Sequence, residues 1–250
     1  MTAQLHEIAE SLSPQALMGR LLSDDGLLSG FAGNASRVCI TCSFQAEDMA
    51  VLHLLRQRLP NVPVLFLDTG YHFAETYAYR DRMTAAWSLN LQNLRPATTV
   101  AQQESALGIL HQTDPTRCCQ LRKVEPLMAA LENFDIWFTG LRREQSPTRK
   151  NLKKLEQHRL PTGRSLLKVS VLADWSWHEV AQYINRYQIE FLPLYHLGYP
   201  SIGCEPCTSL PVDGSDSRSG RWAGKKLECG IHTFSERLEK AETCKSQLSS

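Results

Sequence analysis

The chain has 250 residues, of which 42% are hydrophobic and 21% are charged. Its 27 lysines and arginines against 26 aspartates and glutamates leave a formal net charge of +1. This composition is typical of a globular protein and argues against a disordered chain. A chain so close to neutral has no overall attraction to nucleic acid or to an anionic membrane, so any anion site must be built from local groups of arginine and lysine.

The length predicts one α/β domain with appendages, because 250 residues lie near the upper limit of what a single core supports. Residues 1–12 lack the apolar stretch of an export signal, and no run of about 18 uncharged apolar residues predicts a membrane span. Eight cysteines in such a chain are more typical of metal binding or catalysis than of a disulfide framework. We therefore expect a cytoplasmic protein.

In chain order, residues 1–36 predict one or two short helices. Apolar and β-branched residues predict strands at 37–42, 63–67, 135–139 and 166–171, and helical patterns follow at 49–59 and 74–86. Ser176 and Glu179 form a capping-box pattern at the start of a further helix. Residues 195–224 predict a long functional loop, and 234–247 a charged helix. Strands separated by helices predict a parallel, twisted sheet with helices on both faces.

Three polar segments, 43–48, 68–76 and 140–149, each follow a predicted strand directly. Ligands of such sheets bind at the carboxyl ends of the strands, so we expect these segments to meet at one crevice. Ser43 to Asp48 forms a strand-to-helix turn, where backbone N–H groups favour an anion. Asp68 could accept a hydrogen bond from a ribose or an adenine.

Four cysteines form two pairs, Cys118 with Cys119 and Cys204 with Cys207. Thiolates select zinc, copper(I) or iron–sulfur clusters. Adjacent residues on a helix point about 100° apart, which suits a bulky cluster better than one small ion. The spacing therefore favours a [4Fe–4S] cluster over zinc, and the alternative is four unrelated cysteines.

A further cysteine, Cys229, follows two lysines, and nearby cations raise the thiolate fraction of a thiol. His232 could pair with it across a tight turn. We interpret Cys229 as a candidate nucleophile, with an incidental thiol as the alternative. Cys39 and Cys42 are expected in the core, and Cys244 is expected to have no role.

Arginines gather in two places: after the strand at 135–139 and just before Cys229. Their guanidinium forks match phosphate and sulfate oxygens, whereas the alternative is a solvated charged face. Lys123 lies four residues after Cys119, where a helix would turn it toward a cluster and temper the cluster's negative charge. The arginines concerned are Arg142, Arg143, Arg149, Arg218 and Arg221.

Together these segments resemble the assimilatory adenylyl-sulfate (APS) reductases, relatives of the phosphoadenylyl-sulfate (PAPS) reductases. The resemblance is carried by motifs that span residues 37 to 232: 42–48 (CSFQAED), 67–76 (LDTGYHFAET), 118–127 (CCQLRKVEPL), 140–146 (GLRREQS), 198–207 (GYPSIGCEPC), 218–222 (RSGRW) and 228–232 (ECGIH).

The resemblance implies an adenine-nucleotide α-hydrolase-like fold. We expect a nucleotide-binding domain at 1–207 and a mobile C-terminal segment at 208–250, with 208–232 as a lid, because Cys229 must meet first the substrate and then its reductant. The resemblance also implies a [4Fe–4S] cluster on Cys118, Cys119, Cys204 and Cys207, with Cys229 as the nucleophile and thioredoxin as the electron donor. The implied reaction converts APS to sulfite and AMP through a thiosulfonate on Cys229, in sulfate assimilation and cysteine biosynthesis. The side chains and backbone expected to contact substrate are Ser43, Asp48, Asp68, Gly140, Arg142, Arg143, Arg149, Arg218, Arg221 and His232.

Three alternatives stay open. A reductase that prefers PAPS or accepts both nucleotides is the nearest, although the PAPS-specific branch generally lacks the cluster cysteines. An ATP pyrophosphatase of the same fold would need a Ser-Gly-Gly-x-Asp-Ser loop, which 43–48 is not. A non-catalytic zinc module would leave Cys229 unexplained. A homodimer or homotetramer would suit the family.

Overall fold

A six-stranded sheet organises the part of the chain that the computed structural model describes, namely residues 3–23, 37–211, 218–222, 226 and 228–232. The strand order is β3-β2-β1-β4-β6-β5. All neighbouring strands are parallel except β5 and β6, which are antiparallel. The strands are β1 (Val38–Thr41), β2 (Pro63–Leu67), β3 (Asn90–Leu94), β4 (Ile136–Phe138), β5 (Leu155–Arg159) and β6 (Ser165–Val169).

The sheet has a switch point between β1 and β4. From β1 the chain adds β2 and β3 on one side, and it then returns to add β4 on the other side of β1. The helix that follows β1 (Ala46–Arg56) covers one face of the sheet, and the helix that leads into β4 (Glu125–Leu131) covers the other. Open α/β sheets bind ligands in the crevice at such a switch point.

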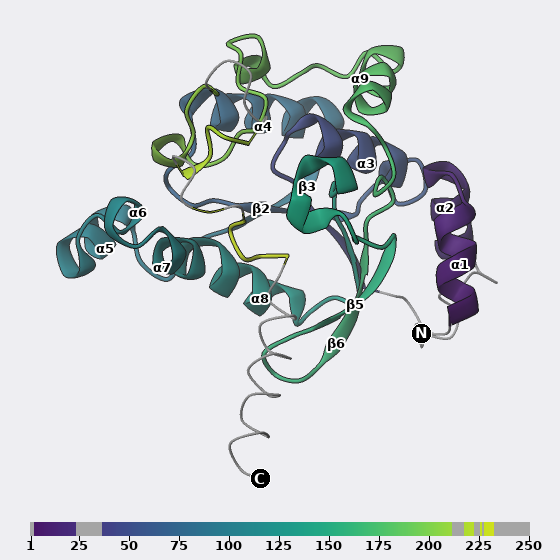
Figure 1. Cartoon of the computed structure of the whole chain (residues 1–250), viewed down its shortest axis with the longest axis horizontal. Coiled ribbons are helices and arrows are strands. Elements are labelled where there is room, and N and C mark those ends of the chain that lie inside the picture. Colours follow the sequence, from purple (N-terminus) through teal and green to yellow (C-terminus); the bar gives the residue numbers. More distant parts are fainter. Residues whose placement is uncertain (1–2, 24–36, 212–217, 223–225, 227, 233–250) are drawn as a thin grey trace.

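Helices cover both faces of the sheet (Figure 1). One face packs against α3, α4 and α9, and the other against α8, which continues from α7 through a π-helical turn. The helices are α1 (Ala3–Ser11), α2 (Pro14–Leu21), α3 (Ala46–Arg56), α4 (Ala74–Trp87), α5 (Val100–Leu107), α6 (Leu110–Thr113), α7 (Pro115–Cys119), η1 (π-helical, Gln120–Val124), α8 (Glu125–Leu131) and α9 (Trp177–Arg186). Short 3₁₀ turns lie at η2 (Arg143–Gln145), η3 (Pro147–Arg149), η4 (Pro193–Tyr195) and η5 (Glu205–Cys207).

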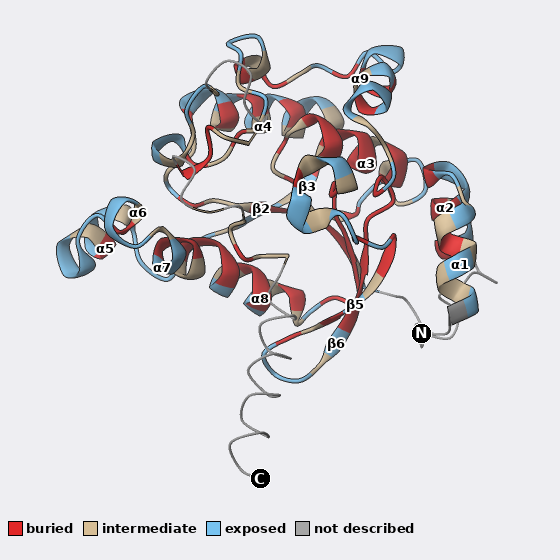
Figure 2. Ribbon diagram, in the orientation of Figure 1, coloured by how far each residue is buried: buried red, intermediate tan, exposed pale blue. Residues whose placement is uncertain are grey.

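Two hydrophobic cores follow from the alternation of side chains along buried strands. Ile40 and Val64 face the larger core with α3, α4 and α9, whereas Cys39, Leu65 and Trp137 face the core under α8. The central strands are buried on both faces (Figure 2), as expected for a parallel sheet between helices. Cys39 and Cys42 both lie in the core, as the sequence predicts.

The α/β class, the parallel sheet and the helices on both faces are confirmed. The four predicted strands and the capping box at Ser176 and Glu179 are present. Strands β3 and β5, at the two edges of the sheet, were not predicted. Among the described residues no helix is long and apolar enough to span a bilayer.

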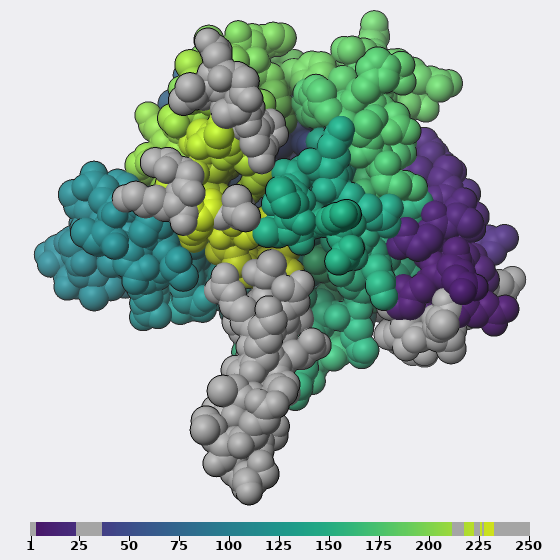
Figure 3. All heavy atoms as spheres, in the orientation of Figure 1, coloured from purple at the N-terminus to yellow at the C-terminus, as the bar shows by residue number. Residues whose placement is uncertain are grey.

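The proposed boundary at residue 207 stays a prediction, as does the movement of the segment beyond it. From here on, the name C-terminal segment means only residues 218–222, 226 and 228–232. These residues lie against the α/β body, between α7 and the loop after β4 (Figure 3, yellow). Residues 212–217, 223–225, 227 and 233–250, which include the predicted terminal helix and Cys244, lie outside the described residues.

Candidate active site

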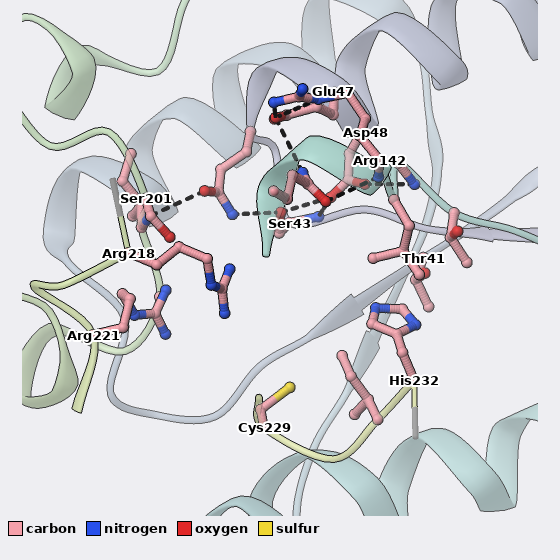
Figure 4. Close-up of a pocket in the computed structure, with 18 of the residues that line it drawn as sticks. Thr41, Ser43, Glu47, Asp48, Arg142, Ser201, Arg218, Arg221, Cys229 and His232 are labelled. Carbon is pink, nitrogen blue, oxygen red and sulfur yellow. Dashed lines mark hydrogen bonds and ion pairs between the residues drawn. The ribbon is translucent and has the colours of Figure 1, made fainter. Parts of the chain in front are cut away.

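A cavity of about 740 Å³ opens at the switch point of the sheet. The carboxyl ends of β1, β2 and β4 and the loops that follow β1 and β4 form one wall, and the C-terminal segment forms the opposite wall (Figure 4). Segments 43–48 and 140–149 thus meet at one site, as the sequence predicts. Of the third polar segment, 68–76, His72 lines this cavity.

Asp48 joins the two loops. Its carboxylate accepts hydrogen bonds from the Ser43 backbone N–H (2.7 Å), the Ser43 hydroxyl (2.6 Å) and the Gly140 backbone N–H (3.1 Å). A Cβ at Gly140 would lie 2.3 Å from Asp48 Oδ1, so only glycine allows this approach. Burial raises the pKa of Asp48 to about 6, helped by the charge of Glu47 and opposed by these hydrogen bonds.

Gln45 links the first loop to the segment that precedes the second cysteine pair. Its amide nitrogen donates to the Ser43 hydroxyl (2.9 Å), and its amide oxygen accepts from the Ile202 backbone N–H (3.0 Å). The preceding residue, Phe44, has a φ of 61°, a left-handed conformation that its buried ring stabilises. Gln45 therefore helps to fix the shape of the cavity wall.

The three arginines of segment 140–149 all bind carboxylates of the protein. Arg142 is buried and donates to Glu47 (2.8 Å) and Glu144 (2.7 Å). Arg143 does not line the cavity, because its guanidinium reaches Glu10 (2.6 Å) and the Leu152 carbonyl (2.8 Å).

Arg149, which lines the cavity, makes a two-pronged contact with Glu228, with both distances 2.9 Å.

Asp68, like Arg143, lies outside the cavity lining, where it accepts hydrogen bonds from Tyr77 (2.8 Å) and Arg95 (3.3 Å). Arg143 and Asp68 are therefore not among the residues that we propose to contact substrate.

The C-terminal segment places Cys229, Arg218 and Arg221 on the wall opposite Ser43 and Asp48 (Figure 4). The Arg221 guanidinium is buried, donates to the Cys207 carbonyl (3.3 Å) and lies 4.6 Å from the Trp222 ring centroid. Burial lowers the pKa of Arg221, although the nearby thiols of Cys204 and Cys229 oppose this shift. A Cβ at Gly203 would lie 2.0 Å from Arg221 Nη2, so glycine makes room for this cation.

His232 stacks on Trp137, with ring centroids 5.4 Å apart and an interplanar angle of 15°. Burial, followed by the charges of Lys168 and Arg149, lowers the pKa of His232 well below its usual range, so its imidazole is neutral. No hydrogen bond joins His232 to Cys229 in the part of the chain that the structure describes. Its ring nevertheless lines the cavity.

The two cysteine pairs line one small cavity next to the large one. Asp114 caps the short helix α7 by accepting from the Arg117 N–H (2.9 Å), and this helix ends in Cys118 and Cys119. Cys204 pairs with His72 in an isolated β-bridge, and its sulfur lies 3.3 Å from the Thr69 hydroxyl. The loop after β2 therefore holds the second pair against the first.

The thiols are close enough to affect one another. Burial raises the pKa of Cys118 to about 11, and the charges of Cys119, Cys204 and Cys207 add to this shift. Burial also opposes ionisation of Cys204, but Lys123, Thr69 and Arg221 reverse the effect and lower its pKa. The four cysteines, of which Cys207 is half-buried and the others are buried, thus share one pocket with cations beside it.

Lys123 and Trp222 line both cavities. Lys123 belongs to the π-helical turn after Cys119, and such turns are frequent at functional sites. Burial would lower the pKa of Lys123, but the charges of Cys204, Cys119 and Cys229 raise it above its usual value. This buried ammonium therefore stays charged between Cys229 and the cysteine quartet, which consists of Cys118, Cys119, Cys204 and Cys207.

Arg122 ties together the elements that carry and surround the cysteine quartet. This buried side chain donates to the Thr69 carbonyl (2.6 Å) and to the Gln103 side-chain oxygen (3.0 Å). It thereby joins the π-helical turn to the loop after β2 and to α5. All seven described cysteines are free of disulfide bonds.

Sequence reasoning missed four residues of this site. Glu228 and Trp222 lie inside recognised motifs, but neither residue type by itself indicates a partner. Gln45 forms hydrogen bonds through both the nitrogen and the oxygen of its amide, and only the fold brings its second partner, Ile202, close to it. Gly203 could not be singled out from the sequence. The need for glycine there comes from Arg221, about 20 residues later, whose guanidinium occupies the space that a Cβ would fill.

The fold and the cavity together define an α/β protein with a ligand site at the switch point of a parallel sheet. A family model described as "phosphoadenosine phosphosulfate reductase domain" matches residues 37–210. A relative from Rhodococcus opacus (strain B4), named adenosine 5′-phosphosulfate reductase, is 44% identical over 202 residues, covering 80% of this chain and 81% of that protein. A relative of the same name from Streptomyces coelicolor is 44% identical over 198 residues, covering 78% and 82%. The chain therefore belongs to the phosphoadenosine phosphosulfate reductase family.

Solved structures agree on the fold. Phosphoadenylyl-sulfate reductase from Candida auris, in a phosphate complex, superposes with a TM-score of 0.68 at 22% identity, covering 84% of this chain and 98% of that chain. A U34-tRNA thiolase from Methanococcus maripaludis, solved with its [4Fe–4S] cluster, gives a TM-score of 0.52 at 12% identity, covering 96% and 75%. At these identities the likeness concerns the fold alone.

Proposed function

We propose that this protein reduces adenosine 5′-phosphosulfate (APS) to sulfite and AMP, with Cys229 as the nucleophile. The observation that carries the proposal is the position of Cys229, which lines the cavity at the switch point with Arg218 and Arg221 beside it (Figure 4). The names of the relatives from Rhodococcus and Streptomyces support APS as the substrate. The reaction serves sulfate assimilation and cysteine biosynthesis, and we propose that it takes place in the cytoplasm.

The cavity suits a nucleotide. Its volume of about 740 Å³ lies within the usual range of small-molecule sites, roughly 300–1,000 Å³. The apolar carboxyl end of β2, with Leu65 and Leu67, offers a surface for the adenine ring. Ser43 and Gly140, at the starts of the two loops, donate their N–H and hydroxyl hydrogens to Asp48, so we propose that their oxygen atoms accept hydrogen bonds from the ribose hydroxyls.

In the first step the Cys229 thiolate attacks the sulfur of the sulfate group in line with the phosphate oxygen. The bond between that sulfur and the bridging oxygen breaks, and AMP leaves with the electron pair. The product on the enzyme is S-sulfocysteine, Cys–S–SO₃⁻. This step brings a thiolate to an anionic substrate, so without nearby cations the repulsion costs several kcal/mol at low effective dielectric.

Arg221, Arg218 and Lys123 are the side chains that offset this repulsion. All three line the large cavity, and Lys123 and Arg221 are buried. Cations held in place before the reaction need no reorganisation as charge develops, which makes them effective in a water-poor site. The carboxylate-bound Arg142 instead holds the loop that shapes the cavity.

In the second step, a thiolate of reduced thioredoxin attacks the Cys229 sulfur and releases sulfite. The second thioredoxin thiol then closes the disulfide of thioredoxin and frees Cys229 as a thiolate, so the dithiol supplies both electrons. Cys229 must meet first the substrate and then thioredoxin, so residues 228–232 must move between the two steps.

We propose further that Cys118, Cys119, Cys204 and Cys207 hold a [4Fe–4S] cluster. The donor set fits, because four thiols line one pocket and a cation lies beside them. Among the described residues no three potential ligands are arranged around a point to hold a single ion, but a cluster is several ångströms across and its ligands need not meet at one point. When bound, the cluster supplies a fixed charge and a redox-capable metal centre beside the cavity.

PAPS is the alternative substrate. It carries one more phosphate than APS, and that group needs additional cations, whereas the arginines of segment 140–149 are bound to Glu47, Glu10 and Glu228. We therefore expect kcat/KM to be higher for APS. Steady-state kinetics with both nucleotides measure the ratio, and a higher kcat/KM for PAPS would reverse the assignment.

The proposed function is tested by assaying iron and acid-labile sulfide in anaerobically purified protein beside sulfite release from APS with reduced thioredoxin. We expect about four iron and four sulfide per chain, and sulfite release that depends on both APS and thioredoxin. Cys204→Ser should lose the visible absorbance of the cluster, whereas Cys244→Ser should keep it. A colourless wild-type protein that contains zinc and releases no sulfite would contradict the proposal.

A further inference from the structure

Glu228, the residue before the proposed nucleophile, is held by segment 140–149. Its carboxylate accepts two hydrogen bonds from the Arg149 guanidinium, both 2.9 Å, and one from the Thr148 hydroxyl at 3.0 Å. The side chains of Glu228 and Arg149 are 11% and 12% exposed. A two-pronged, nearly buried contact of this kind has a defined geometry, unlike an exposed ion pair.

Arg149 is itself held in place by a second partner, Gln145. It donates a further hydrogen bond to the side-chain oxygen of Gln145. The same Gln145 amide accepts from the Arg142 backbone N–H (3.0 Å) and donates to Glu47 (3.1 Å). Glu47 lies in the first turn of α3, so Glu228 connects the C-terminal segment to the network that shapes the cavity wall.

This arrangement leaves Arg149 engaged within the protein rather than open to an anion in the cavity. Its Nε, Nη1 and Nη2 atoms all donate to Glu228 or Gln145. Burial would raise the pKa of Glu228, but its hydrogen bonds and the charges of Arg149 and Arg218 lower it, so the carboxylate is ionised at neutral pH. Arg149 is therefore better explained as the partner of Glu228 than as a substrate contact.

Consecutive Cα atoms lie about 3.8 Å apart, so fixing Glu228 restricts Cys229 closely. Other contacts of the C-terminal segment lie further from the nucleophile along the chain. Lys226 donates to the Pro115 carbonyl (3.2 Å), and His232 stacks on Trp137. Among the described residues, the contact of Glu228 with Arg149, Thr148 and, at 3.9 Å, Arg218 is the one next to Cys229 along the chain.

We infer that Glu228 is a positioning residue that holds Cys229 over the cavity for attack on the nucleotide and releases it for the second half-reaction. The inference rests on the proposed function. It assigns Arg149 and Thr148 to the same task, in place of the substrate contact that the sequence predicted for Arg149. Loss of the contact should impair the transfer to Cys229 without impairing the discharge of the S-sulfo-enzyme.

The test separates the two half-reactions in the intact, cluster-loaded enzyme. In single turnovers with ³⁵S-labelled APS, Glu228→Gln should form S-sulfocysteine ~10- to 100-fold more slowly, since small misplacements of a reacting group can reduce the rate by this much. Discharge of the isolated S-sulfo-enzyme by reduced thioredoxin should be as fast as in the wild type or faster. The matched control is Glu190→Gln, which removes another arginine-bound carboxylate, that of the surface pair with Arg82.

A second readout needs no substrate. In the free enzyme, iodoacetamide should alkylate Cys229 of Glu228→Gln faster than Cys229 of the wild type, as mapped by peptide mass spectrometry. Iron content and the visible spectrum of each variant verify that it is folded and loaded. Unchanged alkylation together with unchanged transfer would overturn the inference.

The double variant Glu228→Gln, Arg149→Gln distinguishes positioning from direct substrate binding. If the two residues act through each other, the double variant should transfer sulfonate about as slowly as either single variant. Multiplying effects would assign Arg149 an independent contact with the substrate and overturn the inference. If wild-type Cys229 acquires no label at all, the proposed function fails instead, so the two failures are distinguishable.

Discussion

The two groups of arginines look alike in the sequence and differ in the structure. Those that follow β4, Arg142, Arg143 and Arg149, each bind a carboxylate of the protein, on Glu47, Glu10 and Glu228. In the second group, Arg218 lies 3.9 Å from Glu228, whereas Arg221 donates to the carbonyl of Cys207 and lies close to the thiols of the site. The first group therefore ties together the elements around the cavity, and Arg221 supplies charge where the chemistry is proposed to occur.

The comparison shows that an arginine-rich loop need not be an anion site. A buried guanidinium that is paired with a carboxylate has already satisfied its charge, and breaking such a pair leaves an uncompensated charge. Position after a strand indicates which arginines lie near the site. It does not indicate which of them have an acidic partner, because those partners are up to 133 residues away in sequence.

The largest effect should separate one arginine of each group. Arg221→Gln removes a buried cation beside Cys229, and we expect kcat/KM for APS to fall ~100- to 1,000-fold, as for the loss of one preorganised charge-stabilising group. Arg143→Gln should leave kcat/KM within about twofold and lower the thermal midpoint instead, because this side chain ties α1 to the loop after β4. Steady-state kinetics and thermal unfolding at matched iron content measure both. Equal losses of activity in the two variants would contradict the comparison.

A smaller effect is expected when Arg221 is displaced rather than removed. In Gly203→Ala the new methyl group would lie 2.0 Å from Arg221 Nη2, so the guanidinium must shift. We expect kcat/KM to fall roughly tenfold, because the charge remains but leaves its position. Gly19→Ala is the control, since its methyl group would meet the flexible end of Arg58 at 3.2 Å. Activity unchanged by Gly203→Ala would show that Arg221 is not needed where the structure has it.

The smallest effect concerns Asp48, which links the loops after β1 and β4, and appears as a pH dependence of stability. The pKa of Asp48 is raised from 3.8 to about 6, so the folded protein holds this proton more tightly than the unfolded chain does. The contribution of Asp48 to the free energy of unfolding should therefore fall as the pH rises through that interval and stay constant above it. Carbon-13 NMR of the carboxyl groups should show a titration near pH 6 that Asp48→Asn removes. A midpoint near 4 would contradict the burial of this carboxylate.

Most of the fold is predictable because its central strands are apolar on both faces. β1, β2 and β4 carry continuous apolar runs, and the loops that follow them lead to one crevice. β3 (NLQNL) and β5 (LEQHR) escaped prediction because they are the edges of the sheet and are polar and partly exposed. Edge strands are recognised by their neighbours rather than by their own composition.

For the candidate site, the residues were largely predictable from the sequence, but their partners were not. The cysteine quartet, Cys229 and the cations Arg218, Arg221 and Lys123 all have distinctive spacing, and the structure gathers them around two adjoining cavities. The partner of each polar group was not predictable, because pairs such as Arg149 with Glu228 join segments that only the fold brings together. Asp68 illustrates this limit: it directly follows β2, yet its carboxylate binds Tyr77 and Arg95.

The most direct test of the account is to locate the sulfonate after one turnover. Cluster-loaded enzyme is mixed with ³⁵S-labelled APS without thioredoxin, digested, and its labelled peptide is identified. The account predicts label on the peptide that contains Cys229, released as sulfite when reduced thioredoxin is added, and no label in Cys229→Ser. Label on another cysteine, or turnover that survives in Cys229→Ser, would contradict it.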